Sequence, residues 1–292
     1  ALGAVDFLMW VVTGISTGLT QGFSIQLSQY YGAKDFENLR KSLAHSYRLT
    51  AFIAVGVLIL SQSFASLVLT GLHTPSNIIG MSLLYLRIIF CGIPATAAYN
   101  MFASALRAMG NSKTPLTAMI IASVLNVSLD LLFVAGFGWG VAGAAIATVI
   151  AQSFSAVYCF LILRRIDIVH LTRADFMPAS GMNARLMKLG IPVVFQNIII
   201  GVGGLVVQYV INGYGFLFVA GFTATNKLYG LLEMAAISYG YAIVTYVGQN
   251  LGAGKIDRIR KGVRSSMLLS LLTSLIISAA MFLFGKNILS LF

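Results

Sequence analysis

The sequence predicts an all-α membrane protein, a polytopic helical bundle with two pseudo-symmetric lobes. Its composition is 58% hydrophobic and only 9% charged, which is unlike that of a soluble domain. Apolar runs long enough to cross a bilayer as helices, about 20 residues each, recur along the whole chain. A motif that closes the first of these runs returns near the end of the chain, which indicates a protein built from two similar halves.

Eight apolar runs are predicted to cross the membrane. They cover residues 8–29, 49–71, 80–107, 115–137, 140–163, 187–212, 217–248 and 265–285. Pro94 and Pro192 lie inside two of these runs. Because proline removes a helix hydrogen bond, we expect either a static kink or a hinge at each. Gly140 and Gly143 begin a small-residue face, which favours close helix packing.

The motif that occurs twice joins an apolar run to a basic amphipathic stretch through a glycine turn. It runs from Gln29 through Gly32-Ala33 to Arg40-Lys41, and again from Gln249 through Gly252-Ala253 to Arg260-Lys261. Matching residues are 220 positions apart throughout. Six predicted spans separate the copies, and because this number is even, both copies must lie on the same side of the membrane. The halves should therefore be related by an axis near the membrane normal.

The basic residues gather in alternate connections between the predicted spans. The odd-numbered connections carry Lys34, Arg40, Lys41, Arg107, Lys113, Arg164, Arg165, Arg173, Arg185, Lys188, Lys255, Arg258, Arg260, Lys261 and Arg264. The even-numbered connections, at residues 72–75, 138–140 and 212–215, carry no Lys or Arg. This positive-inside pattern predicts that the odd connections are cytoplasmic. The net charge of +11 then reflects membrane topology rather than nucleic-acid binding.

The longest connection divides the chain into two parts. We expect the helices of a first lobe in residues 1–165, a cytoplasmic linker in residues 166–186, and part of a second lobe in residues 187–292. The linker would tether two lobes that can rock against each other. Both chain ends fall on the outer side, without an initiator Met or a signal peptide, so we expect a fragment of a longer protein.

The chemistry should lie where ionisable residues enter the membrane, because burying them is costly. Asn126 precedes Asp130 by four residues, so both project from one helical face. Counted from the turn at Gly138, Asp130 and Thr148 lie roughly 12 and 15 Å deep, at about 1.5 Å per residue. An amide, a carboxylate and a hydroxyl at one depth could bind Na⁺ through oxygens, or carry a proton on the buried carboxyl.

Three other charged residues in the spans leave alternatives open. Arg87, about 10 Å deep, is a candidate to neutralise Asp130 permanently, which would make the pair structural. Glu233 lies near mid-span and could either favour a cationic cargo or pair with a polar group of another helix. Lys227 lies six residues earlier and points about 120° away, so it is a poor partner for Glu233 within the helix.

Several segments, taken together and in this order, resemble the multidrug and toxic compound extrusion (MATE) transporters, nearest the DinF-like branch. Besides the repeated motif they are Tyr85-Leu86-Arg87-Ile88, Gly110-Asn111-Ser112-Lys113-Thr114-Pro115, the Asn126/Asp130 pair and Gly138-Trp139-Gly140-Val141-Ala142-Gly143-Ala144. The resemblance covers essentially the whole chain. It implies a twelve-helix antiporter of two six-helix lobes, of which this chain holds eight spans and lacks the first and last helices.

The resemblance also implies a site and its partners. The family's first-lobe cation site matches Asn126, Asp130 and Thr148, while the family's aspartate on the first helix is missing and Asp6 is not a substitute for it. The seventh-helix acid of some Na⁺-coupled members has no match in residues 187–212, which favours coupling through the first lobe. The implied protein is a monomer of the bacterial inner membrane. It exchanges small-molecule cargo for Na⁺ or H⁺ among lipids, and it uses no cofactor and binds no nucleic acid.

Two other functions remain open. A lipid-linked oligosaccharide flippase of the same superfamily would share the lobes but should have a more basic cavity than Asp130 and Glu233 suggest. A membrane-embedded enzyme would need a clustered catalytic set, and no nucleophile elbow, phosphate loop or metal-hydrolase motif is present. Cys91 and Cys159 have no metal-ligand spacing and are predicted to be packing residues.

Overall fold

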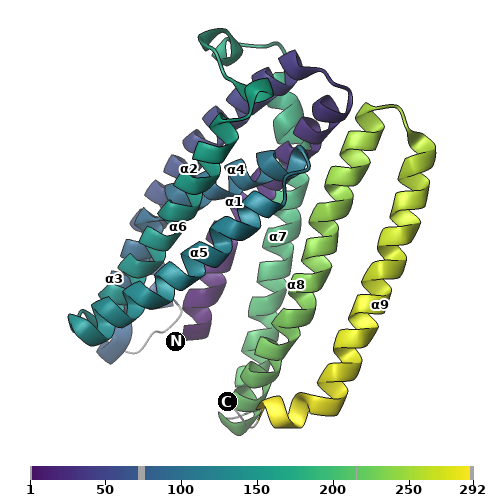
Figure 1. The fold of residues 1–292 in the computed structure, drawn as a ribbon. Coiled ribbons are helices and arrows are strands. Elements are labelled where there is room, and N and C mark those ends of the chain that lie inside the picture. The colour runs from purple at the N-terminus through teal and green to yellow at the C-terminus, as the bar shows by residue number, and fades with distance from the viewer. Residues whose placement is uncertain (1, 72–75, 215, 290–292) are drawn as a thin grey trace.

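A computed structural model describes residues 2–71, 76–214 and 216–289, and every regular element in these ranges is helical (Figure 1). The elements are α1 (Leu2–Gly32), α2 (Phe36–Gly71), α3 (Ser76–Cys91), α4 (Ile93–Ala108), α5 (Lys113–Asp130), η1 (Leu131–Gly136), α6 (Gly140–Arg164), η2 (Asp167–Val169), η3 (Arg173–Phe176), α7 (Met182–Asn212), α8 (Phe216–Gly252) and α9 (Ile256–Leu289). The predicted all-α bundle is confirmed, and each predicted span coincides with a helix or with two consecutive helices.

Several of these helices can cross a membrane. Within the described residues, α2, α5 with its extension η1, α6, α7 and α9 are long and apolar enough, and the pair α3–α4 adds a sixth if it counts as one bent span. The helices α1 and α8, with 31 and 37 residues, also have the necessary length.

The predicted span 80–107 is broken into two helices. The axes of α3 and α4 differ by 42°, and the break lies at Gly92. Pro94 is the second residue of α4, where a proline causes no loss because the first N–H groups of a helix have no partner within it. The kink expected near Pro94 is therefore confirmed, whereas α7 continues through Pro192 as one helix.

The turn between η1 and α6 is packed tightly. Phe133 stacks on Trp139 with ring centroids 5.0 Å apart. A Cβ on Gly143 would lie 2.9 Å from Phe133 Cβ, so the small residue at this position does allow the close packing expected of it. Gly140 has open space around it and serves a different purpose, because it supplies the positive φ of 54° with which α6 begins.

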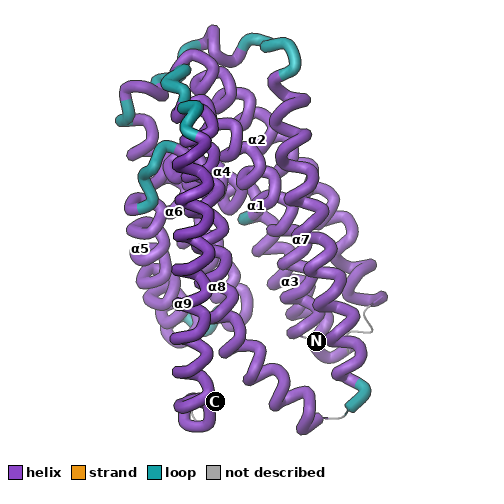
Figure 2. Tube along the Cα trace, turned by 90° about the vertical axis from the view of Figure 1, so that its right-hand side faces the viewer, coloured by secondary structure: helices purple, strands orange, loops and turns teal. Residues whose placement is uncertain are grey.

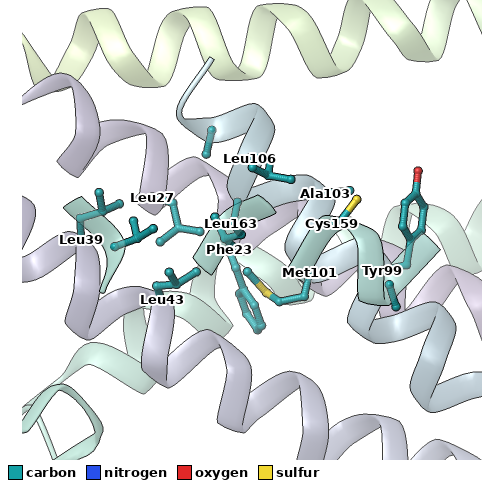
Figure 3. Close-up of a cluster of buried hydrophobic side chains, with 14 of the residues drawn as sticks. Phe23, Leu27, Leu39, Leu43, Tyr99, Met101, Ala103, Leu106, Cys159 and Leu163 are labelled. Carbon is teal, nitrogen blue, oxygen red and sulfur yellow. The ribbon is translucent and has the colours of Figure 1, made fainter. Parts of the chain in front are cut away.

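An apolar core joins α1, α2, α4 and α6 (Figure 3). Its buried members include Phe23, Leu27, Leu39, Leu43, Met101, Leu106, Cys159 and Leu163. Leu39 and Leu43 are one helical turn apart, so the amphipathic first part of α2 places an apolar stripe in this core. Cys159 packs here as predicted, whereas Cys91 is exposed and its sulfur accepts a hydrogen bond from Gln62 Nε2 of α2 (3.3 Å).

The helices form two groups. In Figure 1, α8 and α9 form an antiparallel pair beside α7, and α2 to α6 lie on the other side. α1 packs along α7 and also contacts α4 and α8, so it lies between the groups. The connections at 33–35, 109–112, 165–181 and 253–255, which carry or adjoin most of the basic residues, lie toward one end of the bundle. We call it the basic end; it is uppermost in Figure 1 and Figure 2.

The repeated motif has the same structure in both places. Each copy ends its helix with the same two backbone hydrogen bonds. They are Ala33 N–H to Gln29 O (2.9 Å) and Asp35 N–H to Tyr30 O (3.0 Å) in α1, and Ala253 N–H to Gln249 O (3.0 Å) and Lys255 N–H to Asn250 O (2.8 Å) in α8. The repeat seen in the sequence is therefore a structural repeat, and both copies form the same type of helix cap.

The connection between α6 and α7 is docked on the basic end of α2. Asp175 is 5% exposed, and its carboxylate caps η3 and lies 3.8 Å from Arg40 Nε. His45 is buried, with its ring nitrogens 2.7 Å from Asn183 Oδ1 and 3.1 Å from Met177 O. The segment expected to be a linker thus has fixed polar contacts with the first group of helices.

Candidate functional site

Asp130 is the last residue of α5, where the chain changes from an α-helix to the π-helix η1. Its Oδ1 atom is buried without a hydrogen-bond partner, and so is the Nδ2 atom of Asn126, one turn earlier. Buried polar atoms are almost always paired in proteins, so each of these two unpaired atoms calls for an explanation such as a water or an ion. Short π-helical turns are rare and occur frequently at functional sites.

The chemistry of this face fits a small cation or a proton. Thr148, on the neighbouring helix α6, donates its hydroxyl proton to Ala144 O (3.0 Å). The lone pairs of Thr148 Oγ1 are therefore free to accept. The amide of Asn126 can offer its oxygen instead of its nitrogen after a rotation about its last side-chain bond. Carboxylate, amide and hydroxyl oxygens are the ligands that hard cations prefer.

Arg87 takes no part in this arrangement. Its side chain is exposed, and its backbone carbonyl accepts a hydrogen bond from Gln62 Nε2 (2.8 Å). The ion pairs among the described residues are Arg40–Asp175, Lys41–Glu37 and His170–Asp167. None of these contains Asp130 or Arg87, so the structure offers no support for a permanent pair between them.

Glu233 lies on α8 and is half-buried. Within the described part of the chain it has no ion pair. A Cβ on Gly230, one turn away, would meet nothing within 4 Å, so this stretch of α8 borders open space. Lys227 lies on the same helix, but its side chain falls outside the described part of the structure.

Two contacts between the groups of helices near the basic end leave no local signal in the sequence. The guanidinium of Arg107 lies over the ring of Tyr241, 4.7 Å from its centroid. Gln249 Nε2 donates a hydrogen bond to Ala108 O (2.8 Å). In the sequence Arg107 contributes only to the positive-inside pattern, and no local pattern reveals its partner, because α4 and α8 are far apart in the chain.

No metal centre of the usual kind appears in the residues that the structure describes. There, no three His, Cys, Asp or Glu side chains come together in a way that could hold a metal ion.

A polytopic helical bundle built from a structural repeat is typical of the class of membrane transport proteins. The chain belongs to the MatE family, whose sequence profile matches residues 1–132 and 192–292. The resemblance to multidrug and toxic compound extrusion transporters is thereby confirmed at the level of the family.

Curated relatives agree with this assignment. The probable multidrug resistance protein YoeA of Bacillus subtilis is 27% identical over 98% of this chain and 63% of its own length. The probable multidrug resistance protein YpnP of the same organism is 32% identical over 89% of this chain and 59% of its own. The multidrug export protein MepA of Staphylococcus aureus is 22% identical over 97% of this chain and 62% of its own length. The chain thus spans roughly three fifths of these relatives.

Solved structures share the fold. A multidrug resistance MATE family transporter of the MOP superfamily in an outward-facing conformation has a TM-score of 0.90 at 20% identity, covering 100% of this chain and 65% of its own. A MATE protein in a bent conformation has a TM-score of 0.86 at 20% identity, and the match covers 98% of this chain and 64% of that protein.

Proposed function

We propose that this chain forms the greater part of a cation-coupled antiporter that exports organic, chiefly cationic, compounds by alternating access. The observation that carries the proposal is the pair of buried, unpartnered atoms on Asp130 and Asn126. The names of the relatives, which are multidrug resistance and export proteins, support export of small molecules rather than lipid flipping or catalysis.

The coupling ion is H⁺ or Na⁺. A proton would neutralise the Asp130 carboxylate directly, and Na⁺ would do so with the oxygens of Asn126 and Thr148 as additional ligands. Either ion can drive export only if it binds one arrangement of the lobes more tightly than the other, because a ligand with equal affinity for both shifts nothing. Cargo and cation would therefore use states that exclude each other.

The membrane orientation follows from the charges. The proposal puts the basic end in the cytoplasm of a bacterial cell, in accord with the positive-inside rule. Asp130 lies far from that end, so it would receive the cation from the outer side. The protein would act as a monomer, with cargo, cation and the surrounding lipids as its partners.

The test is efflux of a cationic dye from energised vesicles that carry the full-length protein at equal expression. Wild type is compared with Asp130→Asn, and Asp167→Asn serves as the matched control because that aspartate is an exposed residue between α6 and α7. The proposal predicts gradient-driven efflux in wild type and in Asp167→Asn, and none in Asp130→Asn. Imposing a Na⁺ gradient and a pH gradient separately identifies the ion.

Efflux that persists in Asp130→Asn would make this aspartate structural and would contradict the site. A wild-type protein that moves no dye under either gradient would contradict the transport of cationic compounds. A labelled-lipid flipping assay on the same vesicles then tests the flippase.

A further inference from the structure

The two copies of the repeated motif contact each other. A Cβ on Gly32, at the end of α1, would overlap Gln249 O of α8. A Cβ on Gly252, which matches Gly32 in the second copy, would overlap Gln29 O of α1. Each glycine therefore allows the backbone of the opposite helix to come closer than it could to any residue with a Cβ.

A third pair of matched residues belongs to the same contact. Ser28 and Gly248 are 220 positions apart, and a Cβ on Gly248 would overlap the side-chain oxygen of Ser28. The two copies therefore contact each other through equivalent residues. Interfaces across a two-fold axis have this property. The local axis of the repeat thus passes between the ends of α1 and α8. We call these six residues, Ser28, Gln29, Gly32, Gly248, Gln249 and Gly252, the paired-motif contact.

Two polar interactions join the helix groups close to this contact. Gln249 belongs to it and also donates its amide N–H to Ala108 O of α4 (2.8 Å). Tyr241, two turns before Gln249 in α8, lies against the Arg107 guanidinium. The basic end is therefore closed between the groups by backbone packing, a hydrogen bond and a cation–π interaction.

The same face of α8 is open further from the basic end. Gly230 precedes Gly248 by 18 residues, or five helical turns, so both lie on one face, about 27 Å apart. A Cβ on Gly230 would meet nothing within 4 Å. On α1, Gly14 lies 14 residues, or about 21 Å, before Ser28 and is still packed on α7, where Asn197 Nδ2 donates to Gly14 O (3.0 Å). α1 and α8 thus meet at the basic end and separate beyond it, while α1 stays on α7.

We propose that the paired-motif contact is the seal that closes the basic end between the lobes, and that Gly32 and Gly252 set the closeness of that seal. The inference rests on the proposed function, since it assumes that the lobes alternate. Beyond that function, it names the residues that hold the two lobes together at the basic end. A methyl group at either glycine has to push against backbone rather than a side chain, so it must hold α1 and α8 apart. Such a variant should favour the state that is open at the basic end.

The first test measures access rather than transport. A reporter cysteine is introduced as Thr245→Cys, one turn from Gly248 on α8 and away from the basic end, in a Cys91→Ser background of the full-length protein. Its labelling rate with a membrane-impermeant maleimide is measured in inside-out vesicles, which present the basic end to the reagent. Gly32→Ala and Gly252→Ala should each raise the rate at least about fivefold, because the open state becomes more populated.

The matched control is Gly230→Ala, on the same face of α8 but in open space, and its labelling rate should equal that of the parent. Unchanged labelling in both Gly32→Ala and Gly252→Ala, or an equal rise in Gly230→Ala, would overturn the proposal. Because labelling requires no cargo, this result stands even if the protein exports no dye, which separates failure of the seal from failure of the proposed function.

A cross-link keeps the proposal testable if the alanine variants fold poorly. A Cβ on Gly248 would lie 2.9 Å from Ser28 Cβ, so the double variant Ser28→Cys/Gly248→Cys needs a separation about 1 Å larger to reach ordinary disulfide geometry. Oxidation should form the bond in most molecules, protect against labelling from the basic end in the Thr245→Cys background, and stop efflux until a reductant is added. A bond that forms without slowing efflux would show that the seal does not open during transport, which would contradict the proposal.

Discussion

Lys34 and Gly254 occupy the same position in the two copies of the repeated motif, and both have a left-handed backbone, with φ of 58° and 68°. Glycine takes this conformation freely, whereas a residue with a Cβ pays roughly 1–2 kcal/mol. Lys34→Gly should therefore raise the free energy of unfolding by about 1 kcal/mol. Thermal unfolding of the detergent-solubilised protein measures the change.

The control for this substitution is Lys34→Ala, which removes the same charge but keeps a Cβ in the left-handed conformation. We expect no gain in stability from it, and we expect Gly254→Ala to lower the unfolding free energy by about 1 kcal/mol. A gain in Lys34→Ala as large as in Lys34→Gly would show that charge rather than backbone conformation matters at this cap.

The contact between α1 and α7 depends on small residues. A Cβ on Gly22 would overlap Gly190 Cα, so Gly22→Ala must push two helix backbones apart. Overpacking of this kind costs about 1–3 kcal/mol, and the thermal midpoint should fall accordingly. Gly203→Ala on α7 is the comparison, since nothing lies near that position, and it should be neutral or slightly stabilising. Equal midpoints for the two variants would refute the close packing.

The docked segment between α6 and α7 should open more readily without Asp175. Asp175→Ala removes the cap of η3 and the partner of Arg40. Loss of such a cap costs about 0.5–2 kcal/mol, so trypsin should cut this segment roughly 2 to 30 times faster. Asp167→Ala removes an exposed carboxylate from the same segment and should leave the cleavage rate unchanged. Similar rates in the two variants would mean that Asp175 does not hold the segment.

Arg87 provides a direct test of whether Asp130 has a permanent partner. Because the Arg87 side chain is exposed and forms no ion pair among the described residues, Arg87→Gln should keep dye efflux within about twofold of wild type. A structural ion pair would give a different result. Arg87→Gln would then lose as much efflux as Asp130→Asn, and the double variant Arg87→Gln/Asp130→Asn would recover it.

The two roles left open for Glu233, selection of cationic cargo and pairing with a polar group of another helix, predict different effects on efflux. The Glu233→Gln variant keeps the shape of the side chain and removes its charge, so efflux of a cationic dye should fall several-fold while export of a neutral compound is retained. The measurement is the ratio of the two efflux rates in the same vesicles. An equal fall for both compounds would assign Glu233 to structure or coupling rather than to cargo selection.

Much of this fold follows from the sequence because its signals are local. The spans are visible as apolar runs, and the end of each motif copy is visible as a glycine-containing turn. The break before Ile93 is anticipated by Pro94, since a proline acts on its own helix. The π-helix after Asp130 left no such trace. The π-helical turn coincides with the packing of Phe133 against Trp139 and Gly143. The spacing of apolar residues in the sequence does not distinguish a π-helical turn from an α-helical one.

The candidate site also follows from the sequence only in part. Asn126 and Asp130 share a helical face by spacing alone, so the sequence by itself determined their pairing, together with the class of protein and the repeat. Only the tertiary structure decided that their polar atoms are buried without partners, that Arg87 is exposed, and that Gly32 and Gly252 each meet the opposite copy. Spacing along one helix follows from its constant geometry, whereas contacts between α1 and α8 depend on how helices more than 200 residues apart pack, and no local pattern encodes that.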